Sequence, residues 1–278
     1  MTPLSLDAII GDPRSLPSLP AVVLELMASM EQPDVSIRRL ADKISLDQAL
    51  AARTLRLANS SFYGMTTRVA TMEQAIAILG LSTVRMLVTA VSMTTAFGRN
   101  ASATFDFGQF WQRALATAIC AKNLASALNQ TAGTAFLAGL MHAIGELVVA
   151  TRYPVEHAAA EAYQRATDCT QRDAEMAVVG VNYAVVGAAL LQHWRFPPAI
   201  ISAVAHHLNP SSDDDLATTV HLANILAHAL DIAGDSAEAV PQVSDIAWAR
   251  CALTPVTLAF MLDNIRLEYD NICQVLAP

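Results

Sequence analysis

The residue whose type and surroundings best suit a catalytic or metal-binding role is a histidine within an apolar segment. His142 lies in the stretch FLAGLMHAIGELVVA, residues 136–150, and Ala143 follows it. A neutral imidazole can hold a metal ion or transfer a proton near neutral pH. On an apolar helix the favoured role is structural, with the ring bonded to Glu146 one turn on or to a backbone carbonyl. The role of metal ligand stays open as the alternative.

A second candidate is the histidine doublet His206 and His207. Neighbouring residues on a helix point about 100° apart, so the two rings cannot both face inward. We therefore expect one of them to be exposed.

Other catalytic motifs are missing from the sequence. It contains no Gly-rich phosphate loop, no GxSxG elbow and no CxxC pair. The four cysteines, Cys120, Cys169, Cys251 and Cys273, are far apart and are expected to be small buried hydrophobes. We expect no cofactor.

The composition excludes several classes of protein. The chain has 278 residues, of which 54% are hydrophobic and 15% charged, with a formal net charge of −8. Such a chain can bury a large core, whereas its charge disfavours binding to the phosphate backbone of nucleic acid. His142, Glu146 and Arg85 interrupt the longest apolar runs, so no membrane span is predicted. The start MTPLSLDAII lacks the features of a secretory leader, which predicts a cytoplasmic protein.

The periodicity of apolar residues predicts an all-α chain, with no alternating strand pattern. In the first hundred residues, Ser36, Asp47 and Thr71 are expected N-caps, and Gly80 is an expected helix stop. The first helix is expected at 19–30. Later helices are expected at 109–129, 134–151, 155–167, 171–179, 183–193, 197–207, 216–231 and from Thr254–Pro255 to about 275.

The stretch GRNASATFDFG, residues 98–108, interrupts this periodicity with small and turn-forming residues. We place a boundary there, between an N-terminal five-helix lobe at 1–105 and a second helical lobe at 106–278.

Residues 36–60 also permit an alternative, a helix-turn-helix whose second helix would enter a DNA groove. That helix is apolar at Leu50, Leu55 and Leu57, and the expected turn has no glycine. The pattern favours two packed core helices, and no nucleic-acid partner is expected.

Several blocks of the sequence resemble the HDOD domain, a bacterial module related to HD metal-dependent phosphohydrolases. The blocks are LPSLPAVVLELM, LADKISLDQALAARTLRLANSSFYG, EQAIAILGLSTVRMLV, FWQRALATA, FLAGLMHAIGELVV, VGVNYAVVGAALLQHWRFPPAIISAVAHH and VHLANILA, and the resemblance extends from about residue 14 to 230. It implies an all-α fold of two lobes and a role in signal transduction, usually as a regulatory module without a demonstrated reaction.

Catalysis in the related HD enzymes needs several histidines and carboxylates around divalent ions, which activate water and polarise a phosphoryl oxygen. On this resemblance, Arg113 matches the first histidine, and Ala143 replaces the aspartate that would follow His142. A guanidinium about 5 Å from a divalent ion would be repelled by roughly 7 kcal/mol at an effective dielectric of about 20. Two or three neutral imidazoles without a carboxylate are not expected to offset such a repulsion.

Two further ligand positions are also altered. Asn182 and Tyr183 lie where the resemblance implies a histidine, and Asn224 matches the closing aspartate, with His221 nearby. No GYP tripeptide follows HHLNPSSDDD, so similarity to HD-type cyclic-di-GMP phosphodiesterases is poor. The resemblance thus implies a vestigial pocket formed by Arg113, His142, Ala143, Glu146, Tyr183, His206, His207 and Asn224.

Arg113 leads to a sharper hypothesis about this pocket. Its cation could hold a small anionic ligand, or it could pair with Glu146 inside a closed pocket, which is the favoured arrangement. The sequence predicts a noncatalytic regulatory protein that binds a signalling partner. The alternative is a metal-dependent phosphohydrolase with an unorthodox histidine ligand set.

Overall fold

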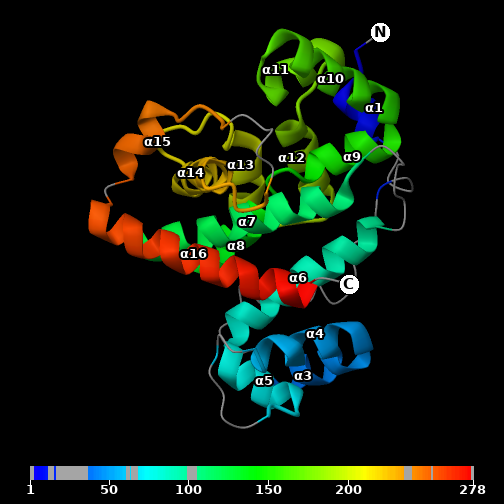
Figure 1. Ribbon diagram of the computed structural model, residues 1–278. Helices are drawn as coiled ribbons and strands as arrows, with labels where there is room; N and C mark the ends of the chain where they lie inside the picture. The colour runs from blue at the N-terminus through cyan, green and yellow to red at the C-terminus, as the bar shows by residue number, and fades with distance from the viewer. Residues whose placement is uncertain are drawn as a thin grey trace. The chain divides into compact units, whose positions relative to one another are not determined.

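The computed structural model describes residues 3–11, 37–60, 68–98, 105–234, 240–251 and 253–276, together with Leu16 and Tyr63. Every regular element in these ranges is a helix, which confirms the all-α prediction (Figure 1). The helix expected at 19–30 and the cap expected at Ser36 lie outside the described residues.

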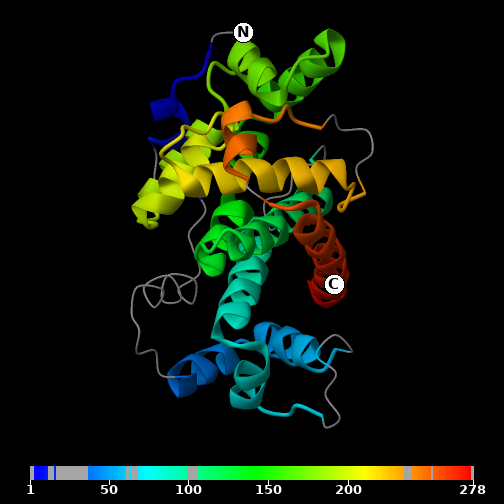
Figure 2. The same ribbon diagram turned by 90° about the vertical axis from the view of Figure 1, so that its left-hand side faces the viewer.

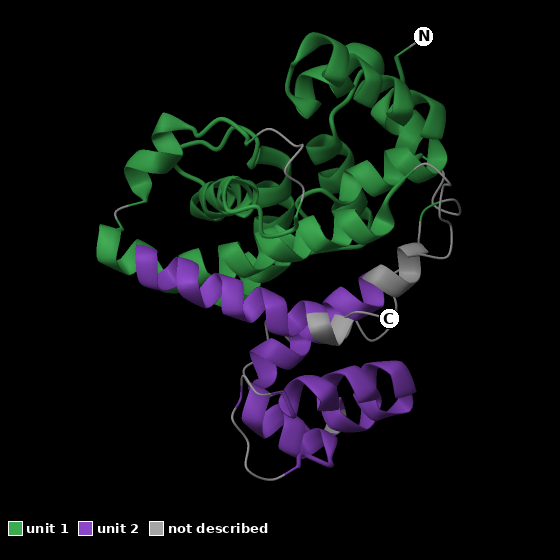
Figure 3. Cartoon of the chain, in the orientation of Figure 1, with its two compact units in different colours: residues 1–17, 97–258 green, residues 18–96, 259–278 purple. Residues whose placement is uncertain are grey.

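The contacts of the chain divide it into two compact units (Figure 3). Unit 1 comprises residues 1–17 and 97–258, and unit 2 comprises residues 18–96 and 259–278. The division therefore differs from a single cut after residue 105. Helix α1 (Leu6–Ile10) belongs to unit 1 because the backbone N–H of Leu4 donates to Val179 O and the hydroxyl of Tyr153 donates to Ala8 O.

Unit 2 contains a group of short helices whose ends follow from capping residues. These helices are α3 (Ile37–Leu46), α4 (Gln48–Ala58) and α5 (Met72–Leu79). The carboxylate of Asp47 accepts from two N–H groups of α4, Thr71 and Gln74 form a capping box on α5, and Gly80 ends α5 at a φ of 79°. These three predicted helix ends are confirmed. Leu50 and Leu57 are buried, as expected for a core helix.

Two longer helices also belong mostly to unit 2 and extend a few residues into unit 1. They are α6 (Leu81–Gly98) and α16 (Pro255–Leu276). Thr254 caps α16 as predicted, since its hydroxyl accepts from the N–H of Thr257 at 3.2 Å.

In unit 1, α7 (Phe107–Ala127) packs against α8 (Ala132–Met141) and α14 (Asp215–Ala229) (Figures 1 and 2). Helix α9 (Ile144–Arg152) packs against α12 (Tyr183–His193), which contacts α13 (Pro198–His206). Glycines allow two of these contacts to be close. A Cβ at Gly145 would lie 2.0 Å from Tyr183 O, and one at Gly139 would lie 2.9 Å from the Cα of Ala118.

Two parts of unit 1 differ from the expected helices. The single helix expected at 134–151 is divided into α8 and α9 at His142 and Ala143. A short helix, α15 (Asp245–Arg250), occupies a region where none was expected, and the Ser244 hydroxyl caps it by accepting from the N–H of Ala247. Helices α10 (Pro154–Thr167) and α11 (Gln171–Val178) pack as a pair near their expected positions.

Two expectations about apolar segments and cysteines need correction. Within the described residues, Ala132–Arg152 is long and apolar enough to cross a membrane by length and composition, and two bent helix pairs also pass this test if each counts as one span. However, 78% of the most apolar window of Ala132–Arg152 is buried within the protein, as in a core helix. Cys120 is buried as expected, but Cys169, Cys251 and Cys273 are only half-buried.

Candidate functional site

A cavity of about 600 Å³ in unit 1 brings together most of the predicted pocket residues. Those that line it are Arg113, His142, Ala143, Glu146, Tyr183, His207 and Asn224. The lining also includes exposed residues such as Arg172 and Val240, so the cavity opens at the surface. The expectation of a closed pocket is therefore wrong.

His142 lies at the break between α8 and α9. Its Nδ1–H donates to the carbonyl of Gly139 at 2.7 Å, which is the acceptor that a continuing helix would use for the N–H of Ala143. Two partners were expected for His142, Glu146 or a backbone carbonyl, and the structure shows the hydrogen bond to the carbonyl. Burial lowers the pKa of His142 to about 3, helped by the neighbouring His207, His228 and Arg113, so the ring is neutral.

His207 is the buried member of the histidine doublet. Its Nδ1–H donates to the carbonyl of Val204 at 2.8 Å, which leaves Nε2 to accept from the hydroxyl of Tyr183 at 3.3 Å. The ring lies edge-on to that of His142, with the two centroids 5.4 Å apart. Burial lowers the pKa of His207 to about 4, so this ring is also neutral.

His206 must be removed from the predicted pocket. Its side chain is 62% exposed and lies near the hydroxyl of Ser202 and the carboxylate of Asp214. The reason is the helical rotation between neighbours, since His207 already faces the cavity. Asn182 also lies outside the cavity lining, where it caps α12 by accepting from the N–H of Val185.

His221 lines the cavity, but the backbone occupies both of its nitrogens. Its Nδ1–H donates to the carbonyl of His207 at 2.8 Å, and its Nε2 accepts from the N–H of Ser244 at 3.0 Å. No lone pair of this ring remains for a metal ion. His221 therefore ties α14 to the segment that begins α15.

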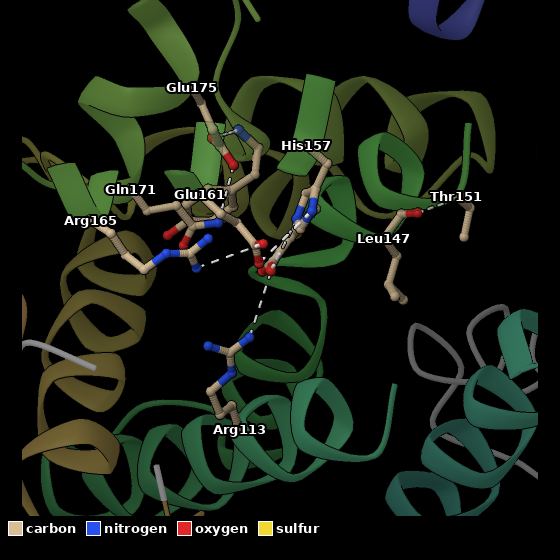
Figure 4. Close-up of polar contacts among 10 residues, drawn as sticks. Arg113, Leu147, Thr151, His157, Glu161, Arg165, Gln171 and Glu175 are labelled. Atoms are coloured by element: carbon tan, nitrogen blue, oxygen red, sulfur yellow. Dashed lines mark hydrogen bonds and ion pairs between the residues drawn. The ribbon is translucent and has the colours of Figure 1, made fainter. Parts of the chain in front are cut away.

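The buried carboxylate of Glu146 is the centre of an ionic cluster, and Figure 4 labels its partners Arg113 and His157. Its Oε1 lies 3.6 Å from a guanidinium nitrogen of Arg113 on α7 and 3.7 Å from Nε2 of His157 on α10. This contact agrees with the hypothesis that Arg113 pairs with Glu146. Burial alone would raise the pKa of Glu146, but the contact with His157 and the positive charge of Arg113 outweigh it and lower that pKa.

A second buried carboxyl, Glu175 on α11, was not anticipated from the sequence. Its two oxygens accept from the N–H of Tyr183 at 2.6 Å and from the side chain of Gln171 at 3.1 Å. Burial raises the pKa of Glu175 to about 8, and the nearby Glu146 acts in the same direction. Glu175 is therefore mostly protonated at neutral pH. Two hydrophilic residues in the apparently polar segment 157–175 are thus part of the interior, His157 and Glu175, and Gln171 is half-buried beside them.

The donors at this site do not form an evident metal centre. Within the described part of the chain, no group of three or more His, Cys, Asp or Glu side chains could hold a metal ion. At the positions where the resemblance implies ligands, the cavity has a guanidinium, a methyl group and an amide, from Arg113, Ala143 and Asn224. The wall does offer hydrogen-bonding groups and the ion pair between the half-buried Arg113 and the buried Glu146.

The sequence and fold can now be compared with those of known proteins. Residues 16–210 match the family model of the HDOD domain. An uncharacterized protein of Treponema pallidum (strain Nichols) is 30% identical over 223 residues, which are 78% of this chain and 43% of the relative. The chain thus spans less than half the length of this curated relative.

Solved structures share the fold over nearly the whole chain. An HDOD domain protein of unknown function from Geobacter sulfurreducens is 21% identical, with a TM-score of 0.79 and coverage of 93% of both chains. A Shewanella amazonensis SB2B protein, whose name proposes a phosphohydrolase, is 27% identical, with a TM-score of 0.76 and coverage of 97% of this chain and 98% of that one. A Marinobacter aquaeolei VT8 protein, whose name proposes signal transduction, is 22% identical, with a TM-score of 0.77 and coverage of 97% of this chain and 60% of that one.

Proposed function

The chain belongs to the HDOD domain family, and we propose that it is a noncatalytic, cytosolic regulatory module that acts in signal transduction by binding another protein. The observation that carries this proposal is the ion pair between Arg113 and Glu146 in the wall of the cavity. A metal ion placed near this pair would be repelled by the guanidinium. It would also have to compete with Arg113 and His157 for the carboxylate of Glu146.

The neighbouring histidines support the same proposal. His221 has both nitrogens engaged, and Nε2 of His207 accepts from Tyr183. Metal binding would therefore require at least one of these hydrogen bonds to break, and no carboxylate beside His142 would compensate for that loss.

Exposed apolar side chains near the cavity support binding to a protein. Val240, Val243, Ile246 and Trp248 lie within nine residues of the chain, and all four are exposed, with Trp248 at 59%. Tryptophan is enriched among the residues that dominate protein interfaces. We propose these four residues as part of the surface that binds the partner.

A second candidate function is a metal-dependent phosphohydrolase, and one observation favours it. His142 and His207 each donate Nδ1–H to a backbone carbonyl, which is the usual arrangement of histidines that bind metal through Nε2. The name of the Shewanella protein proposes the same activity for that protein. In this chain the reaction would need ligands beyond two imidazoles.

The test of the proposed function is hydrolysis of a generic phosphodiester with added manganese, alongside elemental analysis of untagged protein. We expect no turnover above the buffer rate and no divalent ion at one per chain. Turnover that disappears in His142→Ala but persists in His206→Ala would establish the phosphohydrolase instead.

The proposed surface is tested separately, by crosslinking in cells of the source bacterium followed by binding of the purified partner. Trp248→Asp should weaken that binding at least tenfold, which is the usual effect of removing a central aromatic residue. Tyr163→Asp, at an exposed aromatic residue of α10, is the matched control. Equal binding by both variants would contradict this surface.

A further inference from the structure

Two buried side chains of the cavity wall have hydrogen-bonding atoms that the protein itself leaves unused. His142 is 5% exposed and Asn224 is 8% exposed, and both line the cavity. Nδ1 of His142 bonds to Gly139, and Oδ1 of Asn224 accepts from the hydroxyl of Thr117 at 3.5 Å. Within the described residues, Nε2 of His142 and Nδ2 of Asn224 have no such partner. Because both side chains line the cavity, these two atoms can bond to a ligand or to water inside it.

The two unused atoms have opposite hydrogen-bonding character. Because Nδ1 of His142 carries the proton that it donates to Gly139, Nε2 presents a lone pair and requires a donor. Nδ2 of Asn224 is a donor and requires an acceptor. They come from separate elements, the turn between α8 and α9 and the helix α14. A matching ligand therefore needs a donor and an acceptor on different atoms.

An anion does not match this wall. An ionised carboxylate or phosphodiester has only acceptors, so its lone pairs would face the lone pair of His142. Arg113, a cation in the wall, is already opposed by Glu146. Acidic side chains also outnumber basic ones in the lining, because Asp168 and Asp173 join Glu146 against Arg113 and Arg172.

The remaining lining residues favour an uncharged polar molecule. Amide side chains at Gln164, Gln171, Asn209 and Gln242 surround the cavity and can both donate and accept. The volume of about 600 Å³ is within the range of small-molecule sites.

From these contacts we propose that the cavity binds an uncharged small molecule through an amide or lactam group, whose N–H donates to Nε2 of His142 and whose carbonyl accepts from Nδ2 of Asn224. This inference rests on the proposed function, because it treats the cavity as the input site of a regulatory module.

The test is ligand-observed saturation-transfer NMR on the full chain in buffer with a metal chelator. The probes are uracil and 2-pyrrolidinone as uncharged lactams, glucose as a polyol, and inorganic phosphate as an anion. We expect both lactams to bind with dissociation constants on the order of 1 mM, as suits fragments of this size. Asn224→Leu and His142→Ala should each weaken uracil binding at least tenfold.

Matched controls lie outside the cavity lining. His206→Ala and Asn123→Leu, the latter a half-buried asparagine on α7, should bind the lactams like the wild type. Circular dichroism of every variant separates lost binding from lost folding. A lack of lactam binding, equal binding by all variants, or a preference for phosphate or glucose would each overturn the proposal. Because the chelator removes metal, these outcomes are independent of the hydrolysis test.

Discussion

At the scale of single residues, the buried carboxyls of unit 1 determine how its stability depends on pH. Glu175 has a pKa of about 8 in the folded protein, against an ordinary value of 4.5. The folded state therefore holds the proton more tightly than the unfolded chain does. The stabilisation from this group is complete below pH 4.5 and is lost as the pH rises through about 8.

A substitution of Glu175 tests this dependence. Between pH 5 and pH 8, the free energy of unfolding of the wild type should fall by up to about 1.4 kcal/mol per pH unit from this group. Glu175→Gln should remove that slope, because the amide does not ionise. Urea unfolding at several pH values measures this slope, with Glu73→Gln, at an exposed residue of α5, as the control. A slope that survives in Glu175→Gln would contradict this assignment.

Arg113 should contribute to stability through its pairing with Glu146. Arg113→Met leaves a buried carboxylate that only His157 and Gln171 still support, so we expect a loss of about 1–3 kcal/mol. The double variant Arg113→Met/Glu146→Gln should lose less stability than the sum of the two single variants. Each single variant leaves one charge without its partner, whereas the double variant removes both charges. Thermal unfolding of all four proteins measures the coupling. Strict additivity would show that the two side chains do not interact.

At the scale of elements, close packing of α9 on α12 places Glu146 and Tyr183 in the same site. Gly145→Ala would bring a methyl group into the backbone of Tyr183 and Gly187, so it should destabilise unit 1 by about 1–3 kcal/mol or more. Gly108→Ala is a suitable control, since the new methyl group would meet only the side chain of Asp106. Differential scanning calorimetry gives both values. A Gly145→Ala protein as stable as the wild type would be inconsistent with this packing.

The helices could be predicted where a local signal fixes their ends. Asp47, Thr71, Gly80 and Thr254 are such signals, because a cap acts on N–H or carbonyl groups only a few residues away. The break at His142 could not be predicted, because it depends on a ring that competes with the backbone for the carbonyl of Gly139. Apolar periodicity continues across this break and hides it.

At the scale of the whole molecule, the candidate site could be predicted only in part. The family resemblance identified Arg113, His142, Tyr183, His207 and Asn224, which all line one cavity. His157 and Glu175, the buried residues near Glu146, lie in a charged segment whose sequence predicts two solvent-exposed helices. Only the tertiary packing of α10 and α11 shows that these side chains are buried.

The division into units depends on contacts between distant segments, which the sequence pattern does not predict. Residues 1–17 join unit 1, and residues 259–278 join unit 2, so each unit is assembled from distant parts of the chain. The chain passes from one unit to the other near residues 17, 97 and 258. The turn-forming residues at 98–108 predict only the second of these boundaries, because local composition does not indicate which distant segments pack together.

The central claim is that the substitutions at Arg113, Ala143 and Asn224 have removed the ability of this pocket to hold a divalent ion. The most direct measurement is calorimetric titration of manganese into the wild type and into Arg113→His/Ala143→Asp/Asn224→Asp. The account predicts no saturable binding by the wild type and binding of about one ion per chain by the triple variant, because a matched set of imidazoles and carboxylates is what such ions require. Stoichiometric binding by the wild type, lost in His142→Ala, would contradict it.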